Sequence, residues 1–199
     1  FVGVTGSAPA EAVWDANYVA VYHMNDNPDT SHIMDSTTND YDGTKLSANN
    51  PLEADGDLGK KQTFSSDYIE MPAAASVANL STFSIEAFAR PNPLSANNYI
   101  YGESNTGLAN PIYGFTMGYV TTGICYFQHR DDAGSFMNWS IATAYIADSL
   151  HYAVQERLSA STWEMYSDGL SVDTNTDAQG AVTINRVRLG AINTTYFSG

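Results

Sequence analysis

The nine residues 82–90, TFSIEAFAR, decide the fold class of this sequence. Phe83 and Ile85 share one face of an extended chain with two alanines, while Glu86 and Arg90 lie on the other face. Two prolines follow soon after and end the run. A period of two residues bounded by proline is typical of a β-strand with one face in a core.

Similar short runs follow one another along the chain, separated by turns rich in Gly, Asp or Ser. One short helical turn is expected at residues 72–80, and residues 25–43 are predicted as a long polar loop. No long amphipathic helix is present to join parallel strands, which excludes an α/β sheet. The pattern predicts an all-β fold, a two-sheet antiparallel jelly-roll sandwich. Its further strands are expected at residues 18–24, 61–64, 68–71, 98–103, 113–120, 124–129, 136–142, 151–158, 163–166, 182–184 and 186–189.

The predicted strand at 113–120 has two different faces. Tyr113 and Phe115 share one face, and Gly114 and Gly118 share the other. We expect the aromatic face to fill the core. The glycine face indicates a surface that another group approaches closely, either a ligand or a packed neighbour within the sandwich.

Composition and charge exclude several classes of protein. The chain carries 22 Asp and Glu against 8 Lys and Arg, a net charge of -14, so a nucleic-acid partner is not expected. No apolar run approaches the roughly 20 residues that span a bilayer, so no membrane insertion is expected. Cys125 is the only cysteine, which excludes an internal disulfide and a multi-cysteine zinc site.

Several short segments occur in an order and spacing that resemble a known family. They include VWDANYVAVYHMND at 13–26, DSTTNDYDGT at 35–44, FSIEAFARP at 83–91 and WEMYSDG at 163–169. In this order they resemble the concanavalin A-like, laminin-G-like jelly-roll domains of bacterial and archaeal surface proteins. The resemblance implies a domain over residues 13–199 that lacks the family's closing strand. Residues 1–12 are interpreted as a linker or the tail of a preceding module.

The resemblance also implies a structural calcium ion in many members. Ca²⁺ takes about six to eight oxygen ligands, and Asp35, Asn39 and Asp42 lie within one short loop. We therefore expect these three residues as the metal ligands. The alternative is a turn in which the same side chains cap backbone amides.

Aromatic side chains are the expected sugar-binding groups, because their faces stack on sugar C–H groups. The candidate ligand-binding residues are Tyr99, Tyr101, Tyr126 and Trp139. The alternative for each of them is a place in the core of the sandwich.

No catalytic residues are expected. A retaining glycosidase needs two carboxylates about 5 Å apart, and the strand at 82–90 offers Glu86 alone. The one cluster suited to a lyase contains Tyr126, Gln128 and His129, which strand alternation divides between two faces.

Taken together, the sequence predicts a non-catalytic binding or adhesion module of a larger extracellular protein. Its expected partners are a glycan or a cell-surface polymer and the flanking modules of the same polypeptide. One alternative is a structural module of a surface fibre or virion without a small ligand. The other is a polysaccharide hydrolase or lyase.

Overall fold

The structure is a computed structural model that describes residues 13–92, 99–107, 112–119, 124–141, 148–192 and 195–198. The predicted linker at residues 1–12 lies outside these ranges. Within them, no helix is long and apolar enough to cross a membrane.

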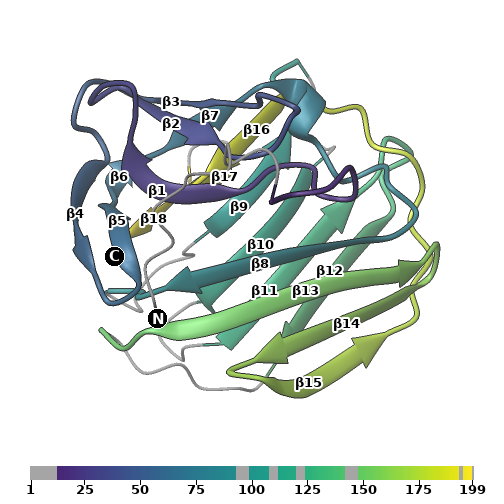
Figure 1. Cartoon of the computed structure of the whole chain (residues 1–199). Coiled ribbons are helices and arrows are strands. Elements are labelled where there is room, and N and C mark those ends of the chain that lie inside the picture. Colours follow the sequence, from purple (N-terminus) through teal and green to yellow (C-terminus); the bar gives the residue numbers. More distant parts are fainter. Residues whose placement is uncertain are drawn as a thin grey trace.

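Two antiparallel sheets form the two layers of the molecule (Figure 1). The smaller layer has four strands in the order β15 (Leu170–Asn175), β14 (Thr162–Ser167), β13 (His151–Ser159) and β8 (Phe83–Ala89). The larger layer has nine strands. In spatial order they are β1 (Tyr22–Asp26), β2 (His32–Asp35), β3 (Gly43–Lys45), β7 (Ile69–Met71), β16 (Arg186–Leu189), β9 (Tyr99–Ser104), β10 (Ile112–Tyr119), β11 (Ile124–Arg130) and β12 (Phe136–Ile141).

Three smaller elements complete the described part of the chain. A three-stranded sheet contains β17 (Ala191–Ile192), β18 (Thr195–Ser198) and β6 (Ser65–Asp67), and a hairpin joins β4 (Leu52–Gly56) to β5 (Gly59–Thr63). The short 3₁₀ turn η2 (Ala73–Ala75) falls within the helical turn predicted at 72–80.

The core lies between the two layers. Trp163 and Met165 of β14 and Tyr113 and Phe127 of the nine-stranded sheet are fully buried in one cluster. The rings of Phe127 and Trp163 are 5.0 Å apart between centroids. The predicted all-β jelly-roll sandwich is therefore confirmed, and Tyr113 lies in the core as its strand face predicted.

The stretch that decided the fold class forms β8, at one edge of the four-stranded sheet. Phe83 and Ile85 pack against the core, whereas Glu86 and Phe88 are exposed. The alternation read from the sequence thus separates the two faces of this strand correctly.

Polar side chains within the core fasten the segment after η2 to both layers. Glu103 of β9 accepts hydrogen bonds from the Ser76 hydroxyl, from the Val77 amide at 2.8 Å and from the Tyr101 hydroxyl at 2.7 Å. Arg157 of β13 donates to the Leu80 carbonyl at 2.9 Å. These contacts hold the connection between η2 and β8 in one position.

Two predictions about secondary structure were wrong. Residues 25–43, predicted as a loop, contain the end of β1, the whole of β2 and the first residue of β3, and Ile33 of β2 is fully buried. Residues 182–184, predicted as a strand, are not part of a sheet. The Val182 amide instead donates to the Asn79 side chain at 2.9 Å, and that side chain donates back to the Val182 carbonyl at 2.6 Å.

Candidate functional site

The nine-stranded sheet has an inner face on the core and an opposite face, which we call the outer face. Val187, Tyr113 and His129 point to the core and are fully buried, so their neighbours along each strand belong to the outer face. The pairing of the strands aligns six outer-face residues, one from each of six neighbouring strands, in a single row across the sheet. The row contains Thr44, Glu70, Arg188, Gly102, Gly114 and Gln128.

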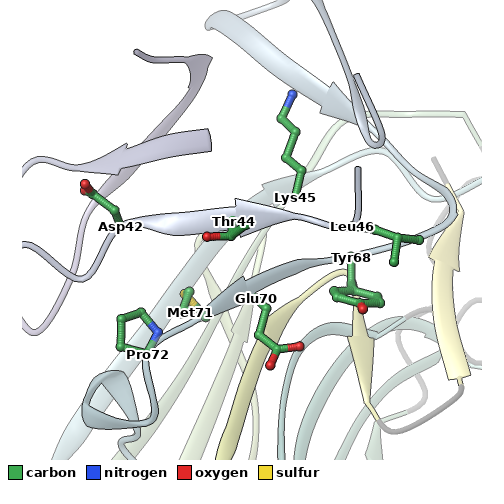
Figure 2. A pocket seen from close by; sticks show the side chains of 8 residues that line it. All are labelled: Asp42, Thr44, Lys45, Leu46, Tyr68, Glu70, Met71 and Pro72. Carbon is green, nitrogen blue, oxygen red and sulfur yellow. The ribbon is translucent and has the colours of Figure 1, made fainter. Parts of the chain in front are cut away.

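A pocket of about 400 Å³ opens where this row crosses β3 and β7 (Figure 2). Figure 2 shows Tyr68 and Glu70 projecting to the same side of β7, while Lys45 points away from them. The buried Lys45 ammonium group is paired with Asp26 and donates to the Pro51 carbonyl at 3.0 Å. The pocket is lined by Asp42, Thr44, Lys45, Leu46, Tyr68, Glu70, Met71 and Pro72.

Arg188 of the neighbouring strand β16 positions two of these lining groups. Its Nε and Nη2 atoms donate to Oε2 of Glu70 at 3.0 and 2.8 Å. The guanidinium carbon also lies 3.6 Å from the centroid of the Tyr68 ring. The Glu70 side chain nevertheless remains 43% exposed, so its carboxylate faces the pocket in a fixed orientation.

This combination of groups suits a ligand with many hydroxyls. An aromatic ring packs against C–H groups, and a carboxylate accepts hydrogen bonds from hydroxyls. The Thr44 hydroxyl can donate or accept beside them. The exposed Leu46 adds an apolar wall.

The aromatic residues predicted to bind sugar lie elsewhere. Tyr99, Tyr101 and Trp139 are only 4, 7 and 6% exposed. The Trp139 indole packs in the core and donates to Asp173 at 2.6 Å, and the Tyr101 hydroxyl donates to Glu103. These three rings therefore do not form the open platform expected from the sequence. Tyr101 and Trp139 pack in the core, and Tyr99 is covered on the outer face. The Tyr126 side chain lies outside what the structure describes.

Tyr99 has a distinct role on the outer face. A Cβ atom added at Gly114 would lie 2.6 Å from the Tyr99 ring, and the Tyr99 hydroxyl donates to Gln128 at 2.8 Å. Ile192 of β17 approaches the same glycine. At Gly114 the glycine face is thus closed by packing within the chain rather than open to a ligand.

The three predicted calcium ligands share a loop, and the side chain of each makes hydrogen bonds within the chain. Both carboxylate oxygens of Asp35 accept hydrogen bonds, Oδ1 from the amides of Val21 and Thr37 and Oδ2 from the Thr37 hydroxyl and the Tyr41 amide. Asp42 accepts from the Asp35 amide at 2.8 Å. The Asn39 side-chain nitrogen donates to the carbonyls of residues 18 and 19 at 3.1 and 3.0 Å. Within the described residues, no group of three His, Cys, Asp or Glu side chains is arranged to hold a metal ion.

The residues considered for catalysis are divided as strand alternation predicted. His129 is buried in the core, whereas Gln128 lies on the outer face next to it. Glu86 lies on the exposed side of the four-stranded sheet and accepts a hydrogen bond from the Tyr152 hydroxyl at 2.6 Å.

Sequence reasoning did not single out the pocket itself. The strand predicted at 68–71 already places Tyr68 and Glu70 on one face, which was the available signal. The contribution of Arg188, 118 residues further along, follows only from the pairing of β7 with β16.

The fold places the chain among antiparallel β-sandwich domains of the jelly-roll type. No protein-family model and no curated protein matches the sequence. Among solved structures, the chain is similar to the binding domain of a paraclostridial mosquitocidal protein, with 14% identity and a TM-score of 0.67 over 92% of this chain and 45% of that one.

Two further structures have the same arrangement. The botulinum neurotoxin serotype D binding domain shares 14% identity, with a TM-score of 0.63 over 91% of this chain and 44% of that one. The CBM40 domain of the Ruminococcus gnavus IT-sialidase, solved with α2,3-sialyllactose, shares 14% identity, with a TM-score of 0.53 over 79% and 84%. The chain spans less than half the length of the mosquitocidal-protein and neurotoxin binding domains. At these identities the likeness is one of fold.

Proposed function

We propose that this domain is a non-catalytic module of an extracellular protein and that it binds a glycan in the pocket of Tyr68, Glu70 and Thr44. The observation that carries the proposal is the way Arg188 holds both the Tyr68 ring and the Glu70 carboxylate at the pocket wall. A ring and a carboxylate fixed in advance lose little conformational entropy when a ligand binds.

The position of Glu70 favours binding over catalysis. Its Oε2 atom already accepts two hydrogen bonds from Arg188, so the carboxylate is suited to receive ligand hydroxyls rather than to transfer a proton. The named neighbours are consistent with a binding role, since two are binding domains, of a mosquitocidal protein and of a neurotoxin, and one was solved with α2,3-sialyllactose.

Retention on a glycan array tests the proposal with three variants. Tyr68→Ala removes the ring, and we expect roughly a tenfold or greater loss of affinity for the glycans that the wild type retains. Tyr68→Phe keeps the ring and should bind nearly as the wild type does. Phe88→Ala, an exposed aromatic residue of the four-stranded sheet, is the matched control and should change nothing.

Two results would contradict the proposal. One is a wild-type protein that retains no glycan on the array. The other is an equal loss of binding in Tyr68→Ala and Phe88→Ala, which would place the ligand away from the pocket.

A further inference from the structure

A second row of outer-face residues begins beside the pocket and crosses the sheet. Arg186 lies two residues before Arg188 on β16, so the two residues belong to the same face. The strand β7, which pairs with β16, continues from Met71 into Pro72, and both of these residues line the pocket. Register links Arg186 to four residues on the next four strands. They are Ser104, Ile112, Arg130 and Phe136.

Arg186 is a half-buried cation that forms no ion pair among the described residues. Its Nε atom is shielded from solvent and has no hydrogen-bond partner in the structure. The ion pairs of the described residues join carboxylates to Lys45, Lys60, Arg90, Arg188, His32 and His151, and none of them includes Arg186. Acidic residues outnumber basic residues by 22 to 8 in this chain, so a cation on the outer face that forms no ion pair is unusual.

Neutral polar groups hold Asn185, the residue before Arg186. The Thr106 amide donates to the Asn185 side chain at 2.9 Å, and that side chain donates to the Thr106 hydroxyl at 2.9 Å. The turn after β11 carries Asp131 and Asp132, whose carboxylates accept hydrogen bonds from the Gly180 amide and the Thr183 hydroxyl. Both acids are therefore engaged in holding loops rather than in pairing with Arg186.

The far end of the row combines a second cation with an exposed ring. The guanidinium carbon of Arg130 lies 4.5 Å from the centroid of the Phe136 ring, and Phe136 is 43% exposed. Three strand spacings separate Arg186 from Arg130, which puts their backbones about 14 Å apart. Arginine side chains are long enough to approach a single ligand from both positions.

We propose that Arg186 and Arg130 bind the anionic groups of an acidic glycan, so that the outer face takes sugars bearing carboxylate or sulfate. This inference rests on the proposed function, since the pocket at Tyr68 holds the neighbouring part of the same ligand. Guanidinium groups bind carboxylate and sulfate through paired, charge-assisted hydrogen bonds. The Phe136 ring packs against the sugar beside Arg130.

Matched polymers that differ only in charge test the proposal. Polygalacturonate is compared with its methyl ester for the carboxylate, and dextran sulfate with dextran for the sulfate. We expect the wild type to bind one charged polymer at least tenfold more tightly than its neutral counterpart. Arg186→Gln and Arg130→Gln should each reduce this preference several-fold, with wild-type melting temperatures as the check on folding.

Lys61→Gln, which removes an exposed cation on β5, is the matched control and should keep the full preference. The proposal is overturned if neither charged polymer is preferred, or if Lys61→Gln reduces the preference as much as Arg186→Gln does. Binding of neutral glycans that depends on Tyr68 would survive either result and leave the proposed function intact. A protein that binds no glycan at all would remove both.

Discussion

His129 gives the protein a specific sensitivity to acid. Its imidazole is fully buried between the rings of Tyr113 and Trp163, and neither ring nitrogen has a hydrogen-bond partner in the structure. Burial lowers the pKa of His129 to about 4, helped by the nearby Arg157 charge and partly opposed by Asp131. The imidazole is therefore neutral in the folded protein at moderately acidic pH.

The effect on stability follows from proton binding in the two states. An unfolded histidine takes up a proton below a pH of about 6.5, whereas the folded one does so only near 4. Between these values the unfolded state binds more protons, so the free energy of unfolding falls as the pH decreases. The His129 contribution to this loss is about 2 kcal/mol between pH 7 and pH 5, and about 3 kcal/mol by pH 4.

Urea denaturation of the wild type and of His129→Phe at pH 7 and pH 5 measures this contribution. Phenylalanine keeps an aromatic ring between Tyr113 and Trp163 but cannot take up a proton, so the loss of stability between the two pH values should be smaller by about 2 kcal/mol. His23→Asn, which replaces an exposed histidine of β1, should lose as much stability as the wild type does. An equal loss in the wild type and His129→Phe would refute the reasoning, because it would mean that the buried imidazole is protonated as easily as an exposed one.

Three other substitutions test how the sandwich is held together. Glu103→Ala leaves the Val77 and Ala78 amides and the Tyr101 hydroxyl without an acceptor, and urea denaturation should show a loss of about 3–5 kcal/mol, with a smaller loss for Glu103→Gln. Gly102→Ala directs a methyl group at the Ala191 carbonyl and should lower stability by about 1–3 kcal/mol in the same assay, while Gly107→Ala, whose added Cβ would lie 3.4 Å from the Asn105 side chain, should cost less. Asp35→Asn should lower the melting temperature of the protein by removing an acceptor of backbone amides. The wild-type melting temperature should be the same in calcium and in EDTA, and a shift on chelation would show that a calcium ion is bound.

The strand pattern was enough to predict the class of fold, because a period of two residues is a local property of the chain. β8 and β13 were predicted within one or two residues of their bounds. The small strands β2 and β4 were missed because their sequences, HIMD and LEADG, contain too few apolar residues to produce alternation. They are strands because neighbouring segments supply their hydrogen-bond partners, as when β3 pairs with β2.

The site was harder to predict because alternation separates two faces without saying which one is inside. Trp139 and Phe136 lie on opposite faces of β12, and either face could have been chosen for a ligand from the sequence. Trp139 packs in the core with the other large rings, and Phe136 is left on the outer face. Which face of β12 is buried depends on the side chains that the second sheet places across the core. The sequence of a single strand does not contain that information.

Net charge also did not predict the site, because it describes the whole chain, whereas a binding site depends on a few residues. A charge of -14 excludes partners that need a broad basic surface, such as nucleic acid. Charges more than about 8–10 Å from a bound anion are largely screened at physiological salt. A sugar carboxylate on the outer face would therefore interact mainly with Arg186 and Arg130. The acidic residues elsewhere on the protein would slow the approach of the sugar more than they would weaken the bound contact. The antiparallel register brings β16 and β11 within three strand spacings and so places Arg186 and Arg130 on one face, which the composition alone does not reveal.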